Sequence, residues 1–130
     1  MINKELKVVG YIRCASKDNA EKSISVQKEA IKDFCKDKGY TLLRFYEDIG
    51  QSGLKADGQA FFEMLADSYA GKFDAVIVHK IDRFSRNIVE LNRNRNILKA
   101  NNVDLYSAYE INANLTEINN MIYRKDDTND

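Results

Sequence analysis

The hydrophobic residues of this chain gather into short runs that alternate with longer amphipathic stretches. Four runs predict buried strands, because they are short, rich in β-branched and aromatic residues, and bounded by polar residues or glycine. They are Leu6–Arg13, Tyr40–Asp48, Phe73–Val78 and Val103–Ala108. The third, FDAVIV, is continuous and β-branched and is the clearest strand of the four.

Three stretches between or after these strands carry apolar residues near helical spacing and predict helices. They are Ser23–Gly39, Gln59–Ala70 and, with approximate limits, residues 86–101. Gly39 is a natural stop for the first helix. The β-α-β-α-β-α-β order predicts an α/β domain of three layers, in which a mostly parallel sheet of four to five strands carries helices on both faces.

The organisation of the chain is that of one domain, because 130 residues give room for a single core and no linker or repeat interrupts the alternation. We expect this domain to occupy residues 1–111 and a short, partly disordered polar tail to occupy residues 112–130. Hydrophobic residues make up 44% and charged residues 31%, which is typical of soluble globular proteins. No apolar run predicts a signal peptide or a membrane span, so we expect a cytoplasmic protein without a membrane partner.

Charge and metal-binding residue types narrow the function classes further. Twenty basic and twenty acidic residues cancel, so any nucleic-acid contact must come from a local concentration of basic side chains. Cys14 and Cys35 lack metal-type spacing and are expected to be reduced, buried thiols. His79, the only histidine, is more typical of a packed or surface residue than of a catalytic one. Asp82 alone would be a poor magnesium site, and we expect no metal and no cofactor.

Functional residues of parallel α/β folds gather at the carboxyl ends of the strands. At the end of the first strand, Arg13 and Ala15 share one face by the period of two, and Cys14 points the opposite way. Asp48 and Ser52 follow the second strand.

After the third strand comes HKIDRFSRN, residues 79–87, which holds Asp82, Arg83 and Arg86. If the third helix begins here, these residues crowd its first turn, where guanidinium groups and open backbone N–H groups bind an anion such as phosphate. For an isolated D-R-x-x-R, a network of surface ion pairs is the more common arrangement. The neighbouring motifs must therefore decide between such a network and an anion site.

Four stretches together resemble the catalytic domain of the serine site-specific recombinases, the superfamily of resolvases, invertases and large phage integrases. They are YIRCAS at 11–16, SISVQ at 23–27, YEDIGQSG at 46–53 and FDAVIVHKIDRFSRN at 73–87. They follow the family's order and spacing and cover almost all of residues 7–108. The longer polar loop before SISVQ resembles the large integrases more than the small resolvases.

The resemblance implies a domain that cleaves and rejoins DNA strands in site-specific recombination or integration, as in mobile elements. A serine hydroxyl attacks a phosphodiester, forms a 5′-phosphoserine link and frees a 3′-hydroxyl. Without a metal, guanidinium groups must neutralise the charge that builds on the phosphorus. The family's motif assigns this clamp to Arg13, Arg83 and Arg86, and an orienting or proton-handling role to Asp82. It gives supporting polar roles to Gln27, Asp48 and Ser52.

Two positions depart from the family's pattern. The pattern Y-x-R-x-S places Ala15 where the nucleophilic serine is expected, so the chain as given is expected to be inactive. Ser16 lies one residue further on, where an extended segment points to the opposite face. Gly58 stands where the family usually has an arginine, which would leave the clamp one arginine short. We therefore expect Ala15→Ser alone to restore little. Ala15→Ser with Gly58→Arg, fused to a dimerising helix and a DNA-binding domain, should do better than either change alone.

The alternative to a recombinase catalytic domain is a non-catalytic remnant that binds DNA backbone or a recombinase partner as a regulator. In both cases the expected partner is DNA, through backbone phosphate, with no small-molecule substrate. A homo-oligomer is expected only when the dimerising helix of the family is present. A small-ligand α/β protein such as a receiver domain is disfavoured, because the chain has no glycine-rich phosphate loop and no acidic trio.

Overall fold

The computed structural model of this protein describes residues 5–14, 20–50, 58–85 and 87–109. Within these ranges, strands and helices alternate along the chain as the hydrophobic pattern predicts. The elements are β1 (Lys7–Cys14), α1 (Ala20–Lys38), β2 (Thr41–Ile49), α2 (Gln59–Tyr69), β3 (Ala75–Val78), the 3₁₀ helix η1 (Ile81–Arg83), α3 (Ile88–Ala100) and β4 (Asp104–Ser107). The predicted tail, residues 112–130, lies outside the described residues.

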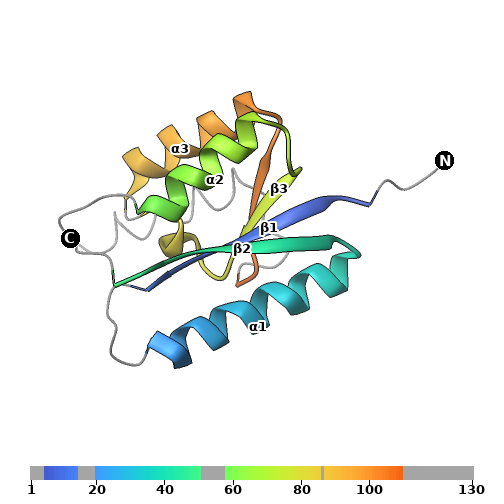
Figure 1. Ribbon diagram of the computed structural model, residues 1–130, viewed down its shortest axis with the longest axis vertical. Helices are drawn as coiled ribbons and strands as arrows, with labels where there is room; N and C mark the ends of the chain where they lie inside the picture. The colour runs from blue at the N-terminus through green and yellow to red at the C-terminus, as the bar shows by residue number, and fades with distance from the viewer. Residues whose placement is uncertain (1–4, 15–19, 51–57, 86, 110–130) are drawn as a thin grey trace.

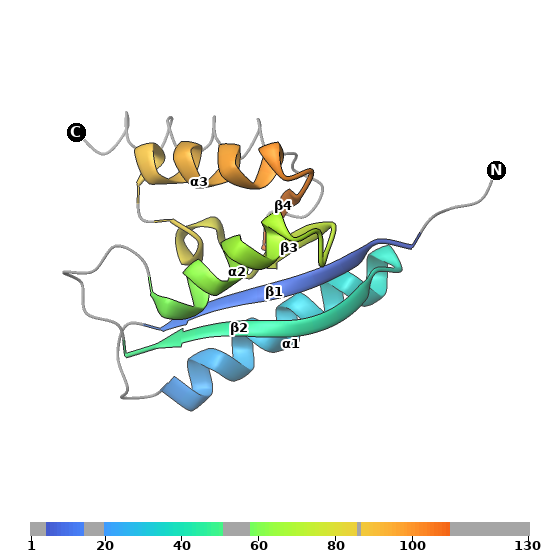
Figure 2. The same cartoon turned by 45° about the horizontal axis from the view of Figure 1, so that its top comes forward.

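The sheet has the strand order β2-β1-β3-β4, and each neighbouring pair is parallel. Helix α1 covers one face, and α2 and α3 cover the other (Figures 1 and 2). The prediction of a three-layer α/β domain is therefore confirmed, with four strands in the part of the chain that the structure describes.

The core consists of two apolar layers, one on each face of the sheet. The period of two along β1 sends Val8 and Ile12 toward α1, where they pack with Ile31. The residues between them, Val9 and Tyr11, belong to the cluster formed with α2 and α3. Because both faces are covered, the strands carry continuous apolar runs rather than an alternation of apolar and polar residues.

Two helix boundaries differ from the sequence-based expectation. Helix α1 begins at Ala20, three residues before Ser23, because its first turn is polar and gives no hydrophobic signal. Helix α3 begins at Ile88, and the Asn87 side chain caps it by accepting a hydrogen bond of 2.8 Å from the backbone N–H of Glu90. Asp82 and Arg83 would have lain in the first turn of the third helix only if that helix began before them, and it does not, since both residues belong to η1.

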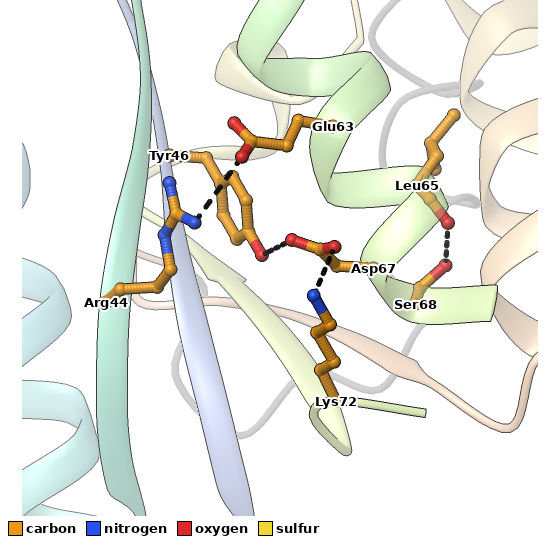
Figure 3. A network of polar contacts seen from close by, with 7 residues as sticks. All are labelled: Arg44, Tyr46, Glu63, Leu65, Asp67, Ser68 and Lys72. Atoms are coloured by element: carbon orange, nitrogen blue, oxygen red, sulfur yellow. Dashed lines mark hydrogen bonds and ion pairs between the residues drawn. The ribbon is translucent and has the colours of Figure 1, made fainter. Parts of the chain in front are cut away.

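A polar network fixes α2 against β2, away from the strand ends (Figure 3). The Tyr46 hydroxyl donates to the Asp67 carboxylate at 2.6 Å, and Lys72 pairs with the same carboxylate at 3.1 Å. Arg44 lies over the Tyr46 ring, 3.9 Å from its centroid, and its guanidinium is 3.7 Å from Glu63. Burial and the neighbouring Asp67 raise the pKa of Tyr46 above its usual range, whereas hydrogen bonds from Tyr46 and Lys72 lower the pKa of Asp67.

Two further observations bear on the class of protein. None of the helices within the described ranges is long and apolar enough to cross a membrane. Cys14 and Cys35 are both buried and neither forms a disulfide, as expected, and burial raises the pKa of the Cys35 thiol to about 11.

Candidate active site

Two arginines meet at the carboxyl ends of β1 and β3, although 70 positions separate them in the chain. The Nη2 group of Arg13 donates a short hydrogen bond to the backbone carbonyl oxygen of Asp82 in η1. The Nη1 group of Arg83 donates back to the carbonyl oxygen of Arg13, at 3.3 Å. These two hydrogen bonds connect the C-terminal end of β1 to η1 and bring two guanidinium groups to one edge of the sheet.

Gln27 in α1 supports the same strand end from the other side. Its side chain is 1% exposed, and its Nε2 group donates to the Arg13 carbonyl at 3.2 Å and to the Ser23 hydroxyl at 3.1 Å. The carbonyl oxygen of Arg13 therefore accepts hydrogen bonds from Gln27 and from Arg83. These two donors hold the backbone in place two residues before position 15.

Asp48 ends the neighbouring strand β2, in register with Arg13 of β1. Its buried carboxylate accepts hydrogen bonds from the Tyr11 hydroxyl at 2.7 Å and from the backbone N–H groups of Ala60 and Phe61 at 2.9 and 3.0 Å. The last two are open donors in the first turn of α2, which a carboxylate satisfies and stabilises electrostatically. Asp48 thus holds the start of α2 at the strand ends.

Gly58 is the N-cap residue of α2 and faces this carboxylate. A Cβ atom at position 58 would lie 2.2 Å from Cγ of Asp48 and 2.4 and 2.5 Å from its two oxygens. The expectation that Gly58→Arg would complete the phosphate clamp is therefore corrected, because any side chain at 58 must first displace a buried carboxylate that accepts three hydrogen bonds.

A pocket of about 390 Å³ opens between the N-terminal half of α1 and the segment that joins β3 to η1. Its lining residues are Lys22, Ser23, Val26, Gln27, His79 and Arg83. Three of them are basic residue types, so the pocket is suited to an anion. Sequence reasoning set His79 aside as a packed or surface residue and overlooked Lys22. The sequence signals of these two residues are weak, because His79 merely follows the buried strand β3 and Lys22 lies in the polar first turn of α1.

The structure describes only some of the residues that were predicted to form the site. Arg13, Asp82 and Arg83 lie together, with Gln27 beside them, and Asp82 contributes its backbone carbonyl to the contact with Arg13. Ala15, Ser16, Ser52 and Arg86 lie outside the described residues. In the described part of the chain, no three His, Cys, Asp or Glu side chains gather in a way that could hold a metal ion.

Comparison of the sequence and the fold with known proteins identifies the family. The family model described as "Resolvase, N terminal domain" matches residues 8–124. No match was found among curated protein sequences.

Several solved structures share the fold. The crystal structure of the N-terminal catalytic domain of TP901-1 integrase has a TM-score of 0.77 at 24% identity, covering 95% of this chain and 96% of that one. A resolvase family site-specific recombinase from Streptococcus pneumoniae has a TM-score of 0.76 at 26% identity, covering 96% and 90%. The C-terminal catalytic domain of ISC1926 TnpA, an IS607-like serine recombinase, has a TM-score of 0.72 at 20% identity, covering 82% and 73%.

The family model spans nearly the whole chain, and the fold agrees with that of the catalytic domains it resembles. The chain belongs to the resolvase N-terminal domain family, the catalytic domains of the serine recombinases.

Proposed function

We propose that this chain is the catalytic domain of a DNA site-specific recombinase in which Ala15 occupies the nucleophile position, so that the chain binds backbone phosphate without cleaving it. The observation that carries the proposal is the reciprocal contact of Arg13 and Arg83 at the strand ends. Two guanidinium groups held by backbone carbonyls are preorganised for a tetrahedral anion, since neither side chain has to be ordered when the phosphate arrives.

In a chain with serine at position 15, the serine hydroxyl gives up its proton, its oxygen attacks the phosphorus in line, and the bond between phosphorus and the 3′ oxygen breaks. The 3′ oxygen takes up a proton, and the 5′ phosphate stays linked to the serine. The charge on the phosphoryl oxygens is stabilised by Arg13, Arg83 and Arg86. The carboxylate of Asp82 either orients the reacting groups or takes part in the proton transfer. The reaction exchanges one phosphodiester for another, so it can run back onto a new strand without an external energy source.

Gln27 and Asp48 act as positioning residues in this proposal. Gln27 holds the Arg13 carbonyl, and Asp48 holds the start of α2 beside the same strand ends. Ser52 is assigned a supporting polar role. The reaction needs no cofactor, because the arginines supply the charge that a metal supplies in other phosphoryl-transfer enzymes.

The alternative is a non-catalytic regulator that binds DNA backbone or an intact recombinase, and Ala15 is the observation that favours it. The native codon at position 15 separates the two functions. An alanine codon in the natural gene favours the regulator, and a serine codon favours the enzyme.

The partner of the domain is DNA, contacted through its backbone. Because the net charge is zero and no base-reading motif is evident, the domain alone binds duplex DNA weakly and without sequence preference. We further propose a cytoplasmic protein of a mobile element that forms a homo-oligomer when the dimerising helix of the family is present.

Titration with inorganic phosphate, followed by NMR, tests the phosphate site. The expected result is a set of shifts at Arg13, Arg83 and their neighbours, weakened several-fold in Arg83→Gln. The matched control is Lys36→Gln, which removes one positive charge from the exposed last turn of α1. Shifts confined to other surfaces, or an equal loss of affinity in both variants, would contradict the proposal.

A further inference from the structure

Tyr109 follows β4 at the carboxyl ends of β3 and β4, with two basic residues beside it. The rings of Tyr109 and His79 meet edge to face with their centroids 6.3 Å apart, and the ammonium group of Lys80 lies 4.7 Å from the Tyr109 centroid. Tyr109 is nevertheless 64% exposed. An aromatic ring that is open to solvent therefore lies among basic side chains, at the edge of the sheet where Arg13 and Arg83 meet.

Hydrogen bonds to the backbone hold Tyr109 at this edge. The carbonyl oxygen of His79 accepts a hydrogen bond of 2.8 Å from the backbone N–H of Tyr109 and one of 3.2 Å from the Ser107 hydroxyl. The first bond extends the contact of β3 with β4 beyond their last paired residues, Val78 and Ser107. Because the backbone is already fixed, little conformational freedom is lost when a ligand packs on the ring.

An exposed aromatic ring beside a cation is suited to a single-stranded nucleic acid. A base stacks on the ring, and the cation contacts the phosphate backbone. Bases inside a duplex are stacked on one another and do not offer a free face, whereas unpaired bases do. The ligand class that fits Tyr109 and Lys80 is therefore a strand with at least one base outside a duplex.

We propose that Tyr109 and Lys80 form a stacking site for an unpaired base of a DNA strand. The base packs on the Tyr109 ring, and Lys80 pairs with a phosphate of the same strand. His79 links this site to the arginines, because it contacts Tyr109 and also lines the pocket that contains Arg83.

The identification of the strand as DNA rests on the proposed function. A strand that is cleaved and rejoined to a new partner has to leave its first partner, so bases at the break are unpaired during part of the reaction. The stacking site gives the domain a means to hold such a base beside the bound phosphate.

The test measures binding of the whole chain to two labelled single strands by fluorescence anisotropy at low salt. One strand is a short oligothymidylate, and the other is its abasic counterpart, which has the same phosphates and no bases. Tyr109→Leu should weaken binding of the oligothymidylate roughly 5- to 150-fold, the effect of losing one base–aromatic stack, and leave the abasic strand unchanged. Tyr109→Phe keeps the ring and should bind as the unmodified chain does.

Two further variants separate charge and position from stacking. Lys80→Gln should weaken both strands by the same factor, because it removes a phosphate contact. The matched control is Tyr69→Leu, which removes a tyrosine that is 83% exposed at the far end of α2, and it should change neither affinity. NMR adds a signature of stacking itself, since the ring current of a stacked base should shift the Tyr109 ring protons upfield.

Each contrary outcome overturns the stacking site. These outcomes are equal affinities of the unmodified chain for the two strands, no binding of the oligothymidylate, and an equal loss of affinity in Tyr69→Leu and Tyr109→Leu. The proposed function is decided separately by the phosphate titration at Arg13 and Arg83. If Tyr109→Leu fails to fold, the ring-proton shifts of the unmodified chain still decide.

Discussion

Replacement of the buried Gly58 by alanine should destabilise the domain, although it adds only one methyl group. The N-cap backbone of Gly58 is extended, with φ −94° and ψ 174°, so alanine meets no backbone strain there. The cost arises from the Asp48 carboxylate, which an alanine Cβ would approach within 2.2–2.5 Å. The carboxylate must then move and give up its bonds to Tyr11 and to the first turn of α2.

The magnitude follows from the bonds that are lost. Loss of the helix-capping interaction costs about 0.5–2 kcal/mol. Leaving the buried Tyr11 hydroxyl without its acceptor adds about 1–3 kcal/mol. The smaller conformational freedom of alanine in the unfolded chain returns about 0.4–1 kcal/mol. The expected net loss lies between about 0.5 and 4.5 kcal/mol, and its midpoint of about 2.5 kcal/mol corresponds to on the order of 10 °C in Tm for a domain of this size.

Urea unfolding of a double-mutant cycle isolates this contact. In an Asp48→Ala background there is no carboxylate to displace, so Gly58→Ala should change the free energy of unfolding by less than about 0.5 kcal/mol, which gives a coupling of about 2 kcal/mol or more. Gly71→Ala is the matched control, because a Cβ there meets nothing within 4 Å and its cost comes from a φ of +76° alone. If Gly58→Ala were as stable as the unmodified chain, or if the two substitutions were additive, the steric argument would be refuted.

Three further predictions concern the network beneath α2, the core and the thiols. Because the pKa of Asp67 is lowered in the folded state, its contribution to stability is present above the ordinary aspartate pKa of 3.8 and is lost as the pH falls through the lowered value. The difference in free energy of unfolding between the unmodified chain and Asp67→Asn, measured by urea titration, should therefore shrink from pH 7 to pH 3. Met64→Ala removes a fully buried side chain and should cost about 2–5 kcal/mol by the same measurement, whereas a cost below 1 kcal/mol would show a loosely packed cluster. Cys35 should resist alkylation at pH 8 until the protein unfolds, because it is buried and its pKa is about 11; rapid labelling of the folded chain would contradict this placement.

The layers of the fold could be predicted from the sequence because they depend on local patterns. Short β-branched runs such as AVIV at 75–78 indicate buried strands, and all four strands lie within a residue or two of their predicted limits. Gly39 ends α1 with a φ of +74°, as its position after the helical pattern predicts. The first turn of α1 and the short helix η1 were missed, because a polar turn and a three-residue helix leave no hydrophobic period to detect.

Some residues of the candidate site could be predicted from the sequence, but the contacts between them could not. The motif brought Arg13 and Arg83 to the same edge of the sheet, yet their bonds run to backbone carbonyls, which no sequence pattern specifies. Asp48 is predicted as a supporting polar residue, but the sequence does not show that its carboxylate caps α2, because that contact also involves the Tyr11 hydroxyl from another strand and the space left by Gly58. The sequence also does not show why glycine stands at position 58 in place of the family's arginine. In the structure, the Asp48 carboxylate fills the space that a side chain at position 58 would need.

The central claim, that position 15 is the nucleophile position of a serine recombinase, is tested most directly by covalent trapping. The chain and its Ala15→Ser variant are each incubated with a nicked suicide duplex, and products are resolved by denaturing gel electrophoresis and mass spectrometry. The account predicts no adduct with the unmodified chain, because alanine has no oxygen to attack phosphorus, and a low yield of 5′-phosphoserine at position 15 in the variant. A phosphoserine adduct at Ser16 in the unmodified chain would contradict it.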